Sequence, residues 1–133
     1  MLAVAIAVIE YEGRYLVARR ADDKPEGGKL EFVGGKLADG ECAYTALLRE
    51  IREELGVCLA GEHYRHLGDV SNQARGVCLH TYLIHLSADS YAILHAKRVG
   101  AEQQPLFWLD KPTLQQRMDD FPVANRQIFD WLD

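Results

Sequence analysis

Residues 35–57, GKLADGECAYTALLREIREELGV, are the most informative stretch of this sequence. Apolar residues recur in it at helical spacing, which predicts a helix over 41–55 that stops at Gly56. Its apolar stripe consists of Tyr44, Leu47, Leu48, Ile51 and Leu55. Glu41 opens this helix, where its charge suits the positive end of the helix dipole.

Three glutamates of this helix, Glu50, Glu53 and Glu54, are spaced at i, i+3 and i+4. A helix places them on one face, within about 6 Å of one another. Such neighbours repel by about 1–3 kcal/mol per pair near a protein surface. Only Glu53 has a basic residue one turn away, Arg49. A divalent cation bound by carboxylate oxygens therefore explains the cluster better than a solvated face held by salt bridges.

The residues around the cluster favour a metal site as well. Gly34 and Gly35 let the backbone approach closely and turn a carbonyl toward a cation. Arg49 lies two turns after Glu41 and is placed to tie Glu41 or Glu53 in position, which would fix the ligands.

The stretch matches the Nudix box at all seven fixed identities and both aliphatic positions: Gly35, Glu41, Arg49, Glu50, Ile51, Glu53, Glu54, Gly56 and Val57. The chain thus resembles the Nudix hydrolases, which cleave a nucleoside diphosphate linked to another group. The resemblance implies an α+β fold, an α/β/α sandwich with a central mixed β-sheet. It also implies water attack on a pyrophosphate phosphorus with Mg²⁺, or Mn²⁺ as the alternative.

Outside the box, the chain resembles the MutT-like 8-oxo-dGTP diphosphatases of this family over nearly its whole length. The similar stretches are ARRA at 18–21, KLEFVGGK at 29–36, EQQP at 102–105 with Trp108, and DFPVAN at 120–125. This implies a pyrophosphohydrolase that converts 8-oxo-dGTP to 8-oxo-dGMP and pyrophosphate, an activity that cleanses the nucleotide pool for DNA replication and repair. One departure is Val33, where the family usually has proline; valine leaves the backbone freer before the glycine pair.

The resemblance also implies the site residues. The metal ligands would be Gly35 (through its carbonyl), Glu50, Glu53, Glu54 and Glu102. The catalytic residues would be Glu50, Glu53, Arg49 and Glu102, with Glu50 as candidate general base, oriented by Arg49, and Glu102 as the alternative base. The substrate contacts would be Arg20 and Lys36 at the phosphates and Phe32 and Asn125 in the nucleotide pocket.

Asn125 has a physical argument of its own. Oxidation at C8 turns guanine N7 into a donor beside the O6 acceptor, and an amide offers both an acceptor and donors on one flat face. The amide of Asn125 can therefore pair with both N7–H and O6 of the oxidised base, whereas unmodified guanine leaves one polar atom mismatched. By position alone, a surface asparagine in the first turn of a helix is equally consistent.

Two alternatives stay open. The first is a Nudix enzyme with another substrate, such as CTP, dCTP or ADP-ribose. The second is a non-catalytic Nudix domain that only binds nucleotides, which the retention of every box glutamate disfavours.

Length and composition indicate one domain over 1–133, with 48% hydrophobic and 26% charged residues. A net charge of −5 without a basic stripe disfavours stable nucleic-acid binding. Three cysteines without a CxxC pair indicate a reducing compartment. The apolar run over 2–9 is too short to cross a membrane. We therefore expect a cytoplasmic monomer or homodimer whose partner is its nucleoside triphosphate substrate.

The remaining elements complete a mixed sheet covered by helices. The patterns predict strands over 2–9, 15–18, 30–33, 77–86 and 106–109, and helices over 112–118 and 122–132. The glycine pair at 34–35 is expected to end its strand, and 36–40 to form a loop.

Overall fold

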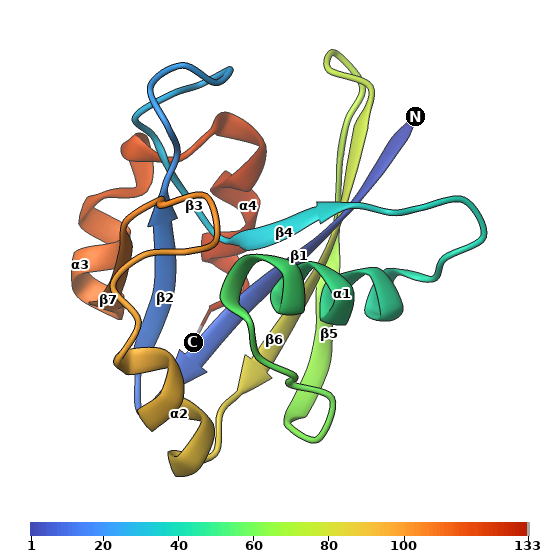
Figure 1. Cartoon of the computed structure of the whole chain (residues 1–133). Helices are drawn as coiled ribbons and strands as arrows, with labels where there is room; N and C mark the ends of the chain where they lie inside the picture. Colours follow the sequence, from blue (N-terminus) through green and yellow to red (C-terminus); the bar gives the residue numbers. More distant parts are fainter. Residues whose placement is uncertain (133) are drawn as a thin grey trace.

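The computed structural model describes residues 1–132. Its strands are β1 (Leu2–Tyr11), β2 (Arg14–Arg19), β3 (Leu30–Glu31), β4 (Val33–Lys36), β5 (His63–Asn72), β6 (Val77–His85) and β7 (Leu106–Asp110). They form one sheet in the order β3-β2-β1-β6-β5, with β4 also paired to β1 and β7 to β2 (Figure 1). β1 and β6 run parallel, whereas the other strand pairs are antiparallel, so the sheet is mixed.

Helices cover both faces of this sheet (Figure 1). They are α1 (Ala43–Leu55), α2 (Ala88–His95), α3 (Lys111–Gln116) and α4 (Arg126–Asp130), with the 3-10 turns η1 (Met118–Asp120) and η2 (Val123–Asn125). Packing contacts place α1 and α2 on one face and α3 and α4 on the other. The predicted α+β fold, an α/β/α sandwich, is therefore confirmed. Within residues 1–132, no helix has the length and apolar character needed to span a membrane.

The core has two halves because β1 buries both of its faces. Side chains alternate along a strand, so Ile6 and Val8 pack toward the C-terminal helices, whereas Ala5, Ala7 and Ile9 pack toward α1 and α2. This two-sided burial fits the place of β1 in the middle of the sheet.

The box helix α1 ends where the sequence predicts but begins two residues later. Gly56 adopts a left-handed φ of 70°, and its N–H donates to the carbonyl of Arg52 at 2.9 Å. At the other end, Cys42 is the N-cap and Glu41 lies outside the helix. The expectation that Glu41 opens the helix is wrong, because its carboxylate instead accepts the N–H of Ala38 at 2.8 Å.

The glycine pair lies inside β4 and does not end a strand. Because β4 extends to Lys36, the prediction of a loop that begins at Lys36 is wrong. Gly34 pairs with Ile6 of β1, and Gly35 with Ala5. A Cβ on Gly34 would collide with the carbonyl oxygen of Ala5. Glycine is thus what lets β4 lie this close to β1.

The elements β5 and α2 are absent from the sequence prediction. β5 is an edge strand with mostly exposed residues, so it carries no apolar alternation. In α2, Leu94 is the buried residue, so the helix shows no apolar stripe. Its N-cap Ser87, whose side chain accepts the N–H of Ser90 at 3.2 Å, could have indicated where the helix begins. The single helix predicted over 122–132 is instead η2 followed by α4, since Asn125 is a weak helix former.

Candidate active site

Glu50 and Gly35 lie face to face where α1 crosses β4. A Cβ on Gly35 would come within 2.5 and 2.6 Å of the two carboxylate oxygens of Glu50. No real Cβ approaches oxygens so closely, so the missing side chain at Gly35 makes the room that the Glu50 carboxylate occupies.

Arg49 binds three of the box glutamates at once. Its guanidinium donates to both oxygens of Glu41 at 2.8 and 2.9 Å, to Glu50 Oε1 at 2.9 Å and to Glu53 Oε2 at 3.3 Å. It also donates to the carbonyl of Lys36 at 2.9 Å, which fastens α1 to the end of β4. Hydrogen bonds from Arg49, then from a backbone N–H, lower the pKa of Glu41 to about 2.

The count of basic neighbours by helical spacing is therefore incomplete for Glu50. It considered only residues one helical turn away, whereas the long side chain of Arg49 folds back to the residue that follows it in sequence. Arg49 forms ion pairs with both Glu41 and Glu53, the two residues that it was expected to hold in position. It also contacts Glu50, which an orienting role requires.

Glu54 is the box glutamate without such compensation. Its Oε2 is buried and has no hydrogen-bond partner among residues 1–132, although the backbone N–H of Gly34 donates to the carboxyl group. Burial first, then the charges of Glu50, Glu31 and Glu102, raise the pKa of Glu54 to about 8. An orphaned carboxylate oxygen among further carboxylates suits a divalent cation.

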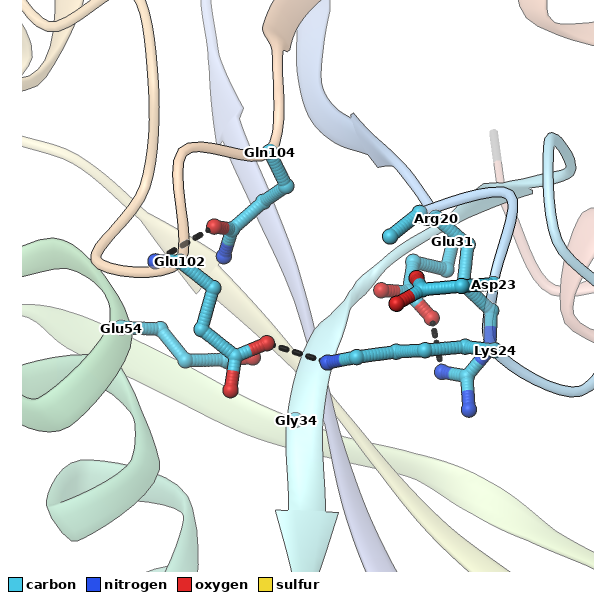
Figure 2. A pocket seen from close by; sticks show the side chains of 9 residues that line it. Arg20, Asp23, Lys24, Glu31, Gly34, Glu54, Glu102 and Gln104 are labelled. Carbon is cyan, nitrogen blue, oxygen red and sulfur yellow. Dashed lines mark hydrogen bonds and ion pairs between the residues drawn. The ribbon is translucent and has the colours of Figure 1, made fainter.

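Glu54 faces a cleft of about 400 Å³ (Figure 2). Its walls come from the β2–β3 loop, the β3–β4 segment, α1 and the loop before β7. The lining residues are Arg20, Ala21, Asp23, Lys24, Glu31, Gly34, Glu54, Glu102 and Gln104. Four of them are acidic and two are basic, so the cleft would repel a polyphosphate unless cations bridged the like charges.

Ion pairs organise the side chains of this cleft. Arg20 Nη1 contacts Glu31 Oε2 at 2.9 Å, and the ammonium of Lys24 pairs with the carboxylate of Glu102. The side-chain oxygen of Gln104 accepts the backbone N–H of Glu102 at 2.8 Å. The hydrogen bond from Lys24 holds the pKa of Glu102 below its ordinary value.

The predicted metal ligands are neighbours, yet their carboxylates do not converge. Within the described chain, no three Asp, Glu, His or Cys side chains lie close enough together to hold an ion. Glu50 and Glu53 turn toward Arg49, and Glu102 turns toward Lys24. The donor set still fits a cation, because the buried oxygen of Glu54 is orphaned and every predicted donor is an oxygen.

The predicted substrate residues are not gathered in one place. Arg20 lines the cleft, whereas Lys36 is exposed at the end of β4. Phe32 is only 3% exposed and belongs to the core beneath the C-terminal helices, where its ring lies 5.1 Å from that of Phe121. Asn125, in η2, is 8% exposed, so it is not the surface asparagine that its position also allowed.

Six cleft residues are absent from the sequence-predicted set: Ala21, Asp23, Lys24, Glu31, Gly34 and Gln104. Glu31 carried a signal, because it is a charged residue between the apolar Leu30 and Phe32 of a predicted strand. Lys24 and Gln104 lie in loops, where no spacing marks them.

The chain matches a family model described as NUDIX domain over residues 1–132. The CTP pyrophosphohydrolase of Escherichia coli K12 is 36% identical over 130 residues, which cover 96% of this chain and 87% of that protein. The 8-oxo-dGTP diphosphatase of the same strain is 30% identical over 130 residues, covering 96% and 92%. The crystal structure of a MutT NUDIX hydrolase from Burkholderia pseudomallei matches with a TM-score of 0.75 at 28% identity, covering 99% of this chain and 98% of that one.

Proposed function

This chain belongs to the NUDIX domain family, and we propose that it hydrolyses a nucleoside triphosphate to the monophosphate and pyrophosphate. The observation that carries the proposal is the cleft in Figure 2, with Glu54 and Glu102 on one side and Arg20 and Lys24 on the other. Basic side chains suit phosphate oxygens, and carboxylates suit the cations that accompany them.

Nudix hydrolases generally use divalent metals, and this chain has suitable donors. We propose Mg²⁺, with Mn²⁺ as the alternative, because all the donors are the hard oxygens that these ions prefer. The residues that would hold it are Gly35, Glu50, Glu53, Glu54 and Glu102. Such a cation, when bound, lowers the pKa of a water molecule and offsets negative charge on the phosphates.

The chain's own residues would position the reactants and move the proton. Glu50 is the candidate base for the attacking water, because Arg49 fixes its carboxylate at 2.9 Å and Gly35 leaves it room. Glu102 is the alternative base, since it lines the cleft. Arg20 would bind the phosphates from within the cleft, and Lys36 from the end of β4.

For the substrate, we propose 8-oxo-dGTP, so that the enzyme would remove an oxidised precursor before DNA synthesis. Asn125 would recognise the oxidised base, because an amide that pairs with a base discriminates strongly against a mismatched donor or acceptor. The 30% identity to the 8-oxo-dGTP diphosphatase over nearly the whole chain supports this substrate.

A second candidate substrate is CTP or dCTP. The observation in its favour is the higher identity, 36%, to the CTP pyrophosphohydrolase of E. coli. At such identities the base-recognition residues can differ while the box glutamates persist, so only a direct comparison of substrates separates the two candidates.

Turnover of 8-oxo-dGTP, dGTP, CTP, dCTP and ADP-ribose at one cation concentration, with the products separated by chromatography, tests the proposal. We expect the highest kcat/KM for 8-oxo-dGTP, and Asn125→Ala to lower it about tenfold more than kcat/KM for dGTP. Gln127→Ala, an exposed neighbour, is the control that should change neither. A higher kcat/KM for CTP or dCTP would establish the second candidate, and no hydrolysis of any nucleotide would contradict the proposed function.

A further inference from the structure

Lys24 reaches across the cleft from the side of Arg20 to the side of Glu54 and Glu102 (Figure 2). It lies in the β2–β3 loop, and its ammonium pairs with Glu102 in the loop before β7, 78 residues away in sequence. This ion pair links two loops across the space where Glu54 leaves a buried oxygen without a partner.

The backbone near Lys24 is held independently of this ion pair. Arg20 Nε donates to the carbonyl of Pro25 at 2.6 Å, and the carbonyl of Arg20 accepts the N–H of Gly28 at 2.8 Å. The β2–β3 loop therefore keeps its shape through Arg20, and Lys24 would stay beside the cleft if its partner were taken away.

The charges of the cleft distinguish Lys24 from Arg20. Arg20 pairs with Glu31 at 2.9 Å, and Glu31 is not among the predicted metal ligands. Lys24 instead neutralises Glu102, which is one of the carboxylates that would hold a divalent cation. An ammonium and a divalent cation on one carboxylate would repel each other strongly, so only one of them can be its close partner.

We infer that Lys24 is a counter-ion and substrate-binding residue of this site: it neutralises Glu102 in the cation-free enzyme, yields this carboxylate to the divalent cation, and then binds a phosphate of the nucleotide. A freed lysine has three donors and no acceptor, which suits phosphate oxygens. The nucleotide step rests on the proposed function, whereas the competition for Glu102 concerns the cation alone.

Titration with Mn²⁺ in the absence of nucleotide, followed by the electron paramagnetic resonance signal of the free ion, tests the competition. Lys24→Met should bind Mn²⁺ about threefold to tenfold more tightly than the wild type, because the competing charge is gone. The matched control is Lys29→Met, which removes one charge from the same loop region but lies outside the cleft, beside Glu26 at 3.8 Å. This control should bind Mn²⁺ like the wild type. Equal or weaker binding by Lys24→Met would overturn the competition.

The second step is measured at saturating Mn²⁺ with the best nucleotide of the panel. Lys24→Met should raise KM about fivefold or more while kcat changes less, since a phosphate contact is lost. An unchanged KM would overturn the phosphate contact. Circular dichroism of each variant verifies its fold, and Lys24→Gln replaces Lys24→Met if that variant does not fold. If the wild type binds Mn²⁺ but hydrolyses no nucleotide, the proposed function is contradicted. The competition between Lys24 and the cation for Glu102 is still tested by the Mn²⁺ titration alone.

Discussion

At the scale of single residues, two adjacent glycines serve different purposes. Gly34 makes room for the backbone of Ala5, and Gly35 makes room for the side chain of Glu50. A backbone atom cannot move without disturbing the sheet, whereas the end of a glutamate side chain can rotate away. Substitution of the first should therefore affect the fold, and substitution of the second the chemistry.

We predict that Gly35→Ala lowers kcat about a hundredfold because the Glu50 carboxylate is displaced, while the free energy of unfolding stays close to that of the wild type. Gly34→Ala should instead lower the free energy of unfolding by about 1–3 kcal/mol. Urea unfolding and steady-state kinetics of both variants measure the two effects. A fully active Gly35→Ala enzyme would show that the position of Glu50 does not matter to the reaction.

Local spacing made the box glutamates predictable, since three and four residues along a helix always share a face. The same reasoning missed the contact of Arg49 with Glu50, because it counted turns and ignored side-chain length. It also could not find Lys24, whose partner Glu102 is distant in sequence.

At the scale of elements, the Arg49 guanidinium clamps α1 onto the segment between β4 and α1. It donates hydrogen bonds to both oxygens of Glu41 and to the carbonyl of Lys36. Glu41 thus connects the helix to the loop that precedes it, whereas the sequence predicts that Glu41 is the first residue of the helix.

This clamp should weaken in acid. The pKa of Glu41 in the folded chain is about 2, below its ordinary value of 4.5. Ionised Glu41 therefore contributes stability above the ordinary value, and this contribution disappears as the pH falls from 4.5 toward 2. We predict that Glu41→Gln lowers the urea midpoint at about pH 6 and has a smaller effect at about pH 3. An equal loss at both pH values would show that the charge of Glu41 does not stabilise the fold.

Element prediction succeeded where apolar side chains reveal the buried face, as in α1 and β1. It failed for β5, whose exposed edge position leaves polar residues on both faces. On that strand Asp69 contacts His66 at 2.8 Å and His80 of β6 at 2.9 Å, and the second is a contact between strands that spacing along one strand cannot reveal.

At the scale of the whole molecule, the sandwich brings three distant parts of the chain to one acidic cleft: residues 20–34, the end of α1 and the loop before β7. Carboxylates from β3, α1 and the loop before β7 share this cleft, so folding without a cation places like charges close together. The family resemblance made the architecture predictable. It did not reveal that Phe32 lies in the core beneath the C-terminal helices, away from the cleft lining, because a motif does not show which face of the sheet a side chain takes.

Cation binding should therefore stabilise the folded chain. At a Mg²⁺ concentration about a hundred times Kd, we predict a gain of about 2.7 kcal/mol over chelator-treated protein, seen as a higher Tm. Glu54→Gln should reduce this gain, because it replaces the carboxylate whose buried oxygen has no partner. The same gain in both proteins would mean that the cation binds elsewhere.

We propose above all that this cleft hydrolyses nucleoside triphosphates with a divalent cation. The most direct test is pyrophosphate release from 8-oxo-dGTP and CTP by metal-stripped enzyme, before and after Mg²⁺ is added. We predict no release in chelator and steady release of one pyrophosphate per nucleoside monophosphate once Mg²⁺ is present. Release that continues unchanged in chelator, or that never begins with Mg²⁺ or Mn²⁺, would contradict it.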